Sequence, residues 1–210
     1  MVVARLVLVR HGQSRATVDS VAGGEKGCRG VTDLGHRQAE ALAARLAADT
    51  ELGYVRALVS STLPRAVETA EHLAPVLGLP VDQDRDLCEM HPGEGDGLTW
   101  EQWEARYGSF DLGAEPERPL SPGGESWAEF GVRAQAALTS LAEAGGTVVV
   151  VCHGGIIEQS MVLGLGRPPN TPPGQNLATP PNTSLTEWHV SDEGWRLVRY
   201  ADAAHLAGLA

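Results

Sequence analysis

The sequence predicts an α/β fold: a three-layer sandwich with a mainly parallel central sheet and an antiparallel hairpin at one edge. Short apolar runs rich in β-branched residues, such as Arg5–Val9 and Thr147–Cys152, alternate with stretches of helical spacing. That alternation is typical of parallel strands whose connecting helices cover both faces of the sheet. Near the end of the chain, Thr183–Val190 and Trp195–Tyr200 flank a Ser-Asp-Glu-Gly turn, which predicts the hairpin.

The first half of the chain alternates strand and helix. After the strand Arg5–Val9, Thr32 or Asp33 can cap a helix. The apolar residues on one face of that helix are Leu34, Ala41, Leu42 and Leu46. A second strand, Arg56–Ser60, runs into Ser-Thr-Leu-Pro at 61–64, which predicts a helix with capping hydroxyls and a proline in its first turn.

The second half continues this pattern. A short helix is expected at Thr99–Tyr107, and a longer one from Trp127 to the glycine pair at 145–146. The strand that follows stops at a histidine and turns into a helix over Ile156–Leu165. Six of the 13 prolines lie in residues 166–182, which predicts a long irregular loop.

Negative charge is concentrated in one part of the chain. With 16 basic and 27 acidic side chains the formal net charge is −11, and residues 82–129 hold 13 acids against 3 bases. Nucleic acids and anionic membranes attract basic proteins, so we expect neither as a partner. We predict a single domain over residues 1–210, with an acidic lid-like insertion at about 86–123.

Cysteine usage and the N-terminus bear on location. Cys28, Cys88 and Cys152 are odd in number and far apart, so they predict neither a disulfide framework nor a zinc site. The first residues lack the apolar core of a signal peptide, and no apolar run approaches the ~18–20 residues of a membrane span. A reduced, cytoplasmic protein without a metal is expected, and its oligomeric state stays open.

Charged and nucleophilic side chains follow three of the predicted strands. They are Arg10-His11-Gly12, Ser60-Ser61 with Arg65 one turn on, and His153-Gly154-Gly155. Ligands bind where the carboxyl ends of parallel strands meet, so two histidines and two arginines are expected to converge there. Helix N-termini add a positive field. A multiply charged anion is the expected ligand, and the glycine after each histidine would let the backbone approach it.

Other sites fit the sequence less well. A lone histidine after a strand is more often a packing residue than a catalyst, but here an apolar strand followed by His-Gly occurs twice. The chain has no Gly-x-Ser-x-Gly motif, and its single lysine, Lys26, belongs to no phosphate-binding loop motif. Glu89, His91, Glu94 and Asp96 could bind a cation, although an exposed acidic loop is the favoured interpretation.

Six short motifs, in order and spacing, resemble those of the histidine phosphatase superfamily, which has the phosphoglycerate mutase-like fold. The motifs are Arg10–Ser14, Ser60–Ala70, Leu87–Glu89, Pro122–Ser126, Val151–Gly155 and Asn182–Ser184. Thr32–Ala39 also matches the helix that follows the first motif. The resemblance runs over about residues 5–205, essentially the whole chain.

The resemblance implies a phosphatase that acts through a phosphohistidine on a small phosphorylated substrate, without a metal or cofactor. His11 would be the nucleophile, and the transferring phosphoryl group would be surrounded by Arg10, Arg65 and His153. Glu89 would be the general acid. The residues expected to bind substrate are Arg10, Arg65, Thr17 and Gly154.

Charge leads to two expectations about this site. His11 must be neutral to attack, whereas His153 helps most when protonated, so their surroundings should differ. Acidic residues of the lid should favour the protonated form of Glu89. These acids are Asp86, Glu94 and Asp96. We therefore hypothesise that the lid keeps Glu89 protonated and excludes substrates with negative charge beyond the phosphate.

Two other functions stay open. Mutases of this family carry a longer, basic segment after the acid, whereas here 21 residues separate Thr99 from Ser121, with Arg106 and Arg118 as their bases. Thr17 also stands where many members place an asparagine. A phosphomonoesterase is therefore predicted over a mutase. A non-catalytic phosphate-binding module is the alternative from a different class.

Overall fold

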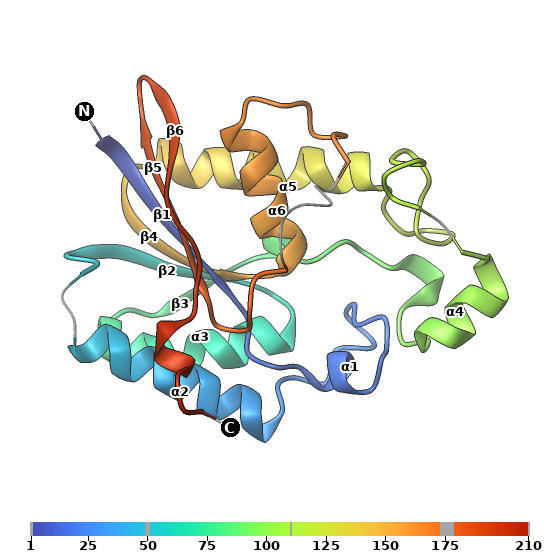
Figure 1. Ribbon diagram of the computed structural model, residues 1–210, viewed down its shortest axis with the longest axis horizontal. Helices are drawn as coiled ribbons and strands as arrows, with labels where there is room; N and C mark the ends of the chain where they lie inside the picture. Colours follow the sequence, from blue (N-terminus) through green and yellow to red (C-terminus); the bar gives the residue numbers. More distant parts are fainter. Residues whose placement is uncertain (1, 49–50, 110, 173–178, 210) are drawn as a thin grey trace.

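The computed structural model describes residues 2–48, 51–109, 111–172 and 179–209. Within these residues the strands form one six-stranded sheet in the order β3-β2-β4-β1-β5-β6 (Figure 1). The strands are β1 (Val2–Arg10), β2 (Val55–Ser61), β3 (Val81–Asp84), β4 (Gly146–Cys152), β5 (Leu185–Ser191) and β6 (Gly194–Asp202). Strands β1 to β4 pair in parallel, whereas β5 pairs antiparallel with both β1 and β6. The predicted mainly parallel sheet with an antiparallel edge hairpin is confirmed.

Helices cover both faces of the sheet, as predicted (Figure 1). The helices are α1 (Arg15–Val18), α2 (Asp33–Ala48), α3 (Pro64–Leu77), α4 (Trp100–Tyr107), α5 (Trp127–Glu143) and α6 (Gly154–Gly164). Three short 3-10 turns are η1 (Arg85–Leu87), η2 (Gly93–Gly95) and η3 (Ala204–Leu206). Helices α2 and α3 pack on one face, α5 and α6 on the other. Among the described residues, no helix combines the length and apolar character needed to cross a membrane.

The two-residue period of the strands sorts their side chains between the two layers. One face of β1 and β4 packs against α2 and α3 through Val7, Val9, Val149 and Val151. The other face packs against α5 and α6 through Leu6, Leu8, Val148 and Val150. Because both faces are buried, each strand is a continuous apolar run. The parallel pairing places the carboxyl ends of β1, β2 and β4 at one edge of the sheet.

Two helix starts differ in how well local sequence predicts them. Thr32 caps α2 as expected, because its Oγ1 accepts a hydrogen bond from the Gly35 N–H at 3.1 Å. The predicted hydroxyl cap of α3 is wrong, since Leu63 occupies the N-cap and makes no capping side-chain hydrogen bond. The Ser61 hydroxyl lies instead 2.6 Å from the ring of His153. The Ser61 hydroxyl therefore bonds to a distant residue, whereas the local sequence pattern predicts that it caps the helix.

Two segments lie outside the regular pattern. The edge strand β3, Val-Asp-Gln-Asp, was not predicted because it carries a single apolar residue and its side chains are half-buried or exposed. Parallel backbone pairing with β2 makes it a strand. The predicted irregular loop at 166–182 falls partly outside the described residues, at 173–178.

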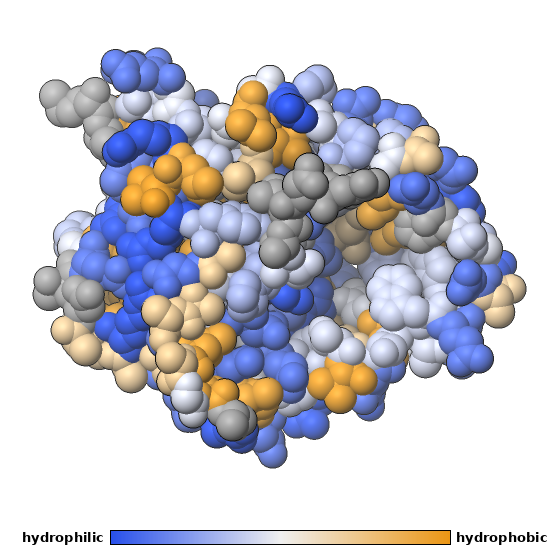
Figure 2. All heavy atoms as spheres, viewed as in Figure 1, coloured by the Kyte–Doolittle hydropathy of each residue, from blue (hydrophilic) through white to orange (hydrophobic). Residues whose placement is uncertain are grey.

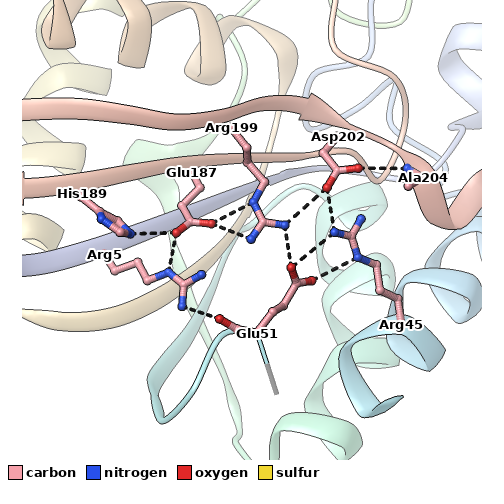
Figure 3. Close-up of polar contacts among 8 residues, drawn as sticks. All are labelled: Arg5, Arg45, Glu51, Glu187, His189, Arg199, Asp202 and Ala204. Carbon is pink, nitrogen blue, oxygen red and sulfur yellow. Dashed lines mark hydrogen bonds and ion pairs between the residues drawn. The ribbon is translucent and has the colours of Figure 1, made fainter. Parts of the chain in front are cut away.

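A buried carboxylate ties the edge hairpin to the rest of the sheet (Figure 3). The Glu187 side chain in β5 is 1% exposed. It accepts hydrogen bonds from Arg5 Nε at 2.6 Å and from Arg199 Nε at 2.8 Å. His189 Nε2 donates to the same carboxylate at 2.9 Å, and Arg199 also donates to Glu51 at 2.8 Å. The network therefore joins β1, β5 and β6 to the segment that precedes β2.

We expect Glu187→Ala to lower the free energy of unfolding by about 3 kcal/mol, because it leaves the largely buried guanidinium of Arg5 without its carboxylate and removes one of the carboxylates that Arg199 contacts. Glu193→Ala, at the exposed turn of the same hairpin, should change that free energy by less than about 0.5 kcal/mol. Urea unfolding followed by circular dichroism measures both. Equal stability of the two variants would contradict a stabilising role for the buried carboxylate.

Candidate active site

Parallel strand pairing brings the two predicted histidines together. In β1 and β4, Arg10 lies opposite Cys152, so the residues that follow them, His11 and His153, leave the sheet side by side. Their ring centroids are 5.2 Å apart, and both side chains are buried. Strand β2 pairs with β4 on its other side, and the helix after β2 carries Arg65 to the same place. The three strand ends meet at one edge of the sheet.

Arg65 is a buried cation between the two rings. Its Nε donates toward His11 Nε2 and His153 Nδ1, each at 3.2 Å. Its Nη1 donates to the carbonyl of Gly23 at 2.6 Å. The loop after Gly23 is held by Asp96, whose carboxylate accepts three hydrogen bonds of 2.8–2.9 Å. Their donors are the backbone N–H groups of Gly24, Lys26 and Gly27. An acid of the predicted lid thus positions the loop that anchors Arg65.

The hydrogen-bond partners assign a tautomer to each histidine ring. His11 Nδ1 lies 2.7 Å from the Gly12 carbonyl, which can only accept, so Nδ1 carries the proton and Nε2 carries a lone pair. His153 Nδ1 faces the Nε–H donor of Arg65, so the proton of this ring is on Nε2. His153 Nε2 then donates to Ser61 Oγ at 2.6 Å. His11 therefore presents an unprotonated Nε2 beside the guanidinium of Arg65.

Both histidines are held in the neutral form by the same two causes. Burial lowers the pKa of His11 and of His153 well below the ordinary value, and the Arg65 cation lowers both pKa values further. The expectation that the two rings have different surroundings is therefore wrong, because one guanidinium lies against both of them. A dianionic group beside His153 would be needed to favour its charged form.

The segment before β5 holds the backbone at His11. Asn182 Nδ2 donates to the carbonyl of His11 at 2.9 Å, and the Thr183 N–H donates to that of Arg10 at 2.8 Å. Thr183 has a φ of +55°, a strained conformation for a β-branched residue. Its hydroxyl donates to its neighbour's carbonyl at 2.8 Å and lies 3.0 Å from His205 Nε2. These contacts keep Asn182 directed at the carbonyl of His11.

The glycines after the histidines differ in what a side chain at each position would meet, and their expected approach to a ligand stays a prediction. A Cβ at Gly12 would lie 2.6 Å from the Gly35 carbonyl oxygen, so Gly12 lets the chain pass close to α2. A Cβ at Gly154 would meet no described atom within 4 Å. A Cβ at Gly155 would lie 2.3 Å from Glu89 Oε1, and the Gly155 N–H donates to Glu89 Oε2 at 3.0 Å. Gly155 therefore makes the space that Glu89 occupies.

The segment that carries Glu89 is clamped from α5 by Arg133. Arg133 Nη1 donates to the carbonyl of Asp86 at 2.7 Å and to that of Cys88 at 3.0 Å. Arg133 also pairs with both carboxylate oxygens of Glu125, each at 2.7 Å. Sequence reasoning missed Arg133, because a helical pattern does not distinguish an arginine that reaches a neighbouring backbone from a solvated one.

A cleft of about 480 Å³ opens beside His11 and Arg65, and it is visible as a hollow between the α4 lobe and the rest of the molecule (Figure 2). Its polar wall includes Arg10, His11, Arg65 and Glu89. Arg10 Nη1 donates to the Pro180 carbonyl at 2.5 Å, and its buried Nε has no hydrogen-bond partner among the described residues. Thr17 and Gly154 also border the cleft, and their role in substrate binding stays a prediction.

Apart from Glu89, the acids that the structure describes in the lid do not line the cleft, so their role in screening substrates stays a prediction. Most acids in residues 82–129 are exposed, and Glu94 stands 3.8 Å from Arg106. Among the described residues that line the cleft, Glu89 is the one acid from this segment. The wall that the lid gives the cleft is mostly apolar, formed by Met90, Pro92, Trp100, Leu112 and Leu120.

The second carboxylate of the cleft comes from α6. Glu158 is half-buried and lines the cleft beside Glu89. Burial raises the pKa of Glu158 to about 7, and the Glu89 charge acts in the same direction, whereas Arg10 opposes it. Sequence reasoning missed Glu158, because only the packing of α6 decides whether this position faces solvent or the cleft.

We expect Gly155→Ala to lower kcat for an alkyl phosphate by ~10²-fold, because a new methyl group displaces the Glu89 carboxylate from its position. Gly154→Ala is the matched comparison, since its methyl group meets no described protein atom within 4 Å and leaves Glu89 in place; kcat should stay close to the wild-type value, and interference with substrate binding would appear in KM. Steady-state hydrolysis of ethyl phosphate measures both variants, with thermal unfolding as the check on folding. Equal loss in the two variants would show that Gly155 does not make room for Glu89.

Comparison with known proteins gives consistent results. The family model of the histidine phosphatase superfamily (branch 1) matches residues 6–203. The phosphoglycerate mutase-like protein 4 of Arabidopsis thaliana is 29% identical over 211 residues, which cover 97% of this chain and 87% of that protein. The glucosyl-3-phosphoglycerate phosphatase of Mycobacterium tuberculosis is 35% identical over 164 residues, which cover 73% of this chain and 71% of that protein.

Solved structures agree with the sequence matches. A mycobacterial glucosyl-3-phosphoglycerate phosphatase in complex with VO3 superposes with a TM-score of 0.76 at 31% identity. The superposition covers 93% of this chain and 98% of that one. The chain thus shares its fold over nearly its whole length with a phosphatase of known structure. It belongs to the histidine phosphatase superfamily (branch 1), and it is an enzyme that hydrolyses phosphomonoesters.

Proposed function

We propose that the protein hydrolyses a small phosphorylated metabolite through a phosphohistidine at His11. The observation that carries the proposal is the state of the His11 ring: Nδ1 donates to the Gly12 carbonyl, so Nε2 keeps its lone pair at the cleft. In the first step Nε2 attacks phosphorus while the ester P–O bond breaks. In the second step water attacks phosphorus and the P–N bond breaks. Phosphate is released, and the His11 ring returns to its neutral form.

Electrostatic stabilisation of the phosphoryl group would come from Arg10, Arg65 and His153. A pair of unit charges ~4 Å apart is worth about 4 kcal/mol at an effective dielectric near 20. The buried Nε of Arg10 is a donor that a phosphoryl oxygen could satisfy. The phosphate dianion would itself favour protonation of His153, so this ring would become a cation when substrate enters. Neutral histidines before binding are therefore compatible with charge stabilisation in the transition state.

Glu89 is the proposed general acid and base. Its carboxyl group would give a proton to the leaving alkoxide, and the resulting carboxylate would then take a proton from the attacking water. The Gly155 N–H at 3.0 Å and the Met90 N–H at 3.1 Å orient this group at the cleft. The Arg133 clamp on the Glu89 segment limits its movement between the two steps.

Hydrolysis is favoured over a mutase reaction by the walls of the cleft. A mutase must retain a phosphorylated sugar acid between two transfers, which needs cations for its carboxylate. Among the described residues that line the cleft, the arginines are Arg10 and Arg65, which lie beside the phosphoryl position. The lid offers an apolar wall instead, so among the described lining residues no further cation would hold the carboxylate of a sugar acid.

His11→Asn should lower kcat by at least ~10³-fold, because it removes the nucleophile. Rapid quenching of wild-type enzyme with a 32P-labelled substrate should give acid-labile, base-stable label on His11. His36→Asn, a change outside the cleft, serves as the control and should keep both the activity and the label. Full activity of the His11 variant would refute the phosphohistidine mechanism.

Glu89→Gln should affect substrates according to their leaving group. An alkyl phosphate needs a proton at its leaving oxygen, whereas p-nitrophenyl phosphate does not, so kcat/KM should fall at least ~10²-fold more for ethyl phosphate. The comparison of two substrates within one variant removes differences in folding. Equal losses on both substrates would assign the acid to another residue.

A further inference from the structure

We infer that Glu158 is a specificity-determining residue that favours phosphomonoesters with a hydrogen-bond-donating ammonium or hydroxyl group next to the ester, and disfavours those with a carboxylate there. The inference rests on the proposed function and names the class of substrate that the same cleft takes. It would also separate this enzyme from phosphatases whose substrate is a phosphorylated sugar acid.

The position of Glu158 makes it part of the substrate cleft. It lies one helical turn after Gly154 and Gly155, at a spacing that puts all three on the same side of α6. Gly155 contacts Glu89, and Glu158 lines the same cleft as Glu89 and Arg10. The side chain therefore stands close to the proposed general acid, where the alcohol part of a bound ester would lie.

Within the part of the chain that the structure describes, the carboxylate of Glu158 stands without a bonded partner. Among the described residues none forms a hydrogen bond or ion pair with it, although it is half-buried. The cations nearby are committed elsewhere: Arg65 contacts both histidines and Gly23, and Arg10 Nη1 contacts Pro180. A half-buried carboxylate without a partner is unfavourable unless a donor reaches it. An ammonium or hydroxyl group on the substrate would be such a donor.

A carboxylate on the substrate would meet the opposite situation. The acid side of the cleft already holds Glu89 and Glu158, and the opposing lid wall is largely apolar. Like charges repel at short range, and the apolar wall provides no donor for a second anion. Selection therefore combines attraction of one substrate class with rejection of the other.

This selection should depend on pH. Burial and the Glu89 charge raise the pKa of Glu158 to about 7, against the effect of Arg10. Glu158 is therefore mostly neutral at pH 6 and mostly charged at pH 8. The other titratable group that faces it is Tyr200 of β6, whose pKa is raised by burial and by Glu158, so its phenol stays neutral over this range. Preference for an ammonium group should grow as the pH rises from 6 to 8.

Three phosphate esters of equal chain length test the inference. Phosphoethanolamine, 2-hydroxyethyl phosphate and phosphoglycolate differ only in the terminal ammonium, hydroxyl or carboxylate. In wild-type enzyme at pH 8, kcat/KM should be highest for phosphoethanolamine and lowest for phosphoglycolate. Glu158→Gln should reduce the ratio of the first to the last by at least tenfold at pH 8, and by much less at pH 6. Glu94→Gln, at an exposed lid carboxylate outside the cleft, should leave the ratio unchanged.

The outcomes separate the inference from the proposed function. Failure of wild-type enzyme to release phosphate from p-nitrophenyl phosphate would refute the proposed function itself. With that activity present, an unchanged ratio in Glu158→Gln at pH 8 would overturn the selective role. An equal loss on all three esters would overturn it as well, because the residue would then act in the chemical step. Thermal unfolding of both glutamine variants confirms that the substitution leaves the fold intact.

Discussion

The buried guanidinium of Arg65 is the contact on which the rest of the site depends. It touches the rings of His11 and His153 at equal distances, and its charge adds to the effect of burial in keeping both rings neutral. A buried cation needs acceptors, and among the described residues the Gly23 carbonyl accepts from Arg65 in addition to the two rings. Asp96 holds the loop after that carbonyl, so a residue of the acidic segment supports this loop from about seventy residues further along the chain.

Around this centre, structural groups fix positions rather than perform chemistry. Asn182 and the strained Thr183 hold the backbone of the nucleophile, and Arg133 holds the segment of the general acid. The Glu89 carboxylate occupies the space that a side chain at position 155 would need, so a glycine is required there. Each of these contacts joins elements far apart in sequence. The rigid three-layer packing beneath them is what allows such contacts to keep their geometry.

The lid carries most of its acidic side chains outside the cleft and apolar side chains along the cleft wall. Its acids point outward into solvent, bond to the loop that anchors Arg65 or pair with Arg133, whereas its inner wall is apolar. The net charge of −11 therefore describes the outer surface and says little about the cleft. Among the described residues that line the cleft, the carboxyl groups are those of Glu89 and of Glu158 in α6, and both lie near Arg10. This division of charge underlies the proposed choice of substrate.

Sequence alone determined the alternation of strand and helix, the edge hairpin, and the strand ends at which His11, Arg65 and His153 meet. These follow from local periods and from the rule that parallel strands end at one edge. Tertiary structure decided the rest: the neutral state of both rings, the use of Ser61 as a partner for His153 rather than as a helix cap, and the inward position of Glu158. The physical reason is that burial and hydrogen-bond partners depend on which elements pack together. A local sequence pattern does not specify that packing.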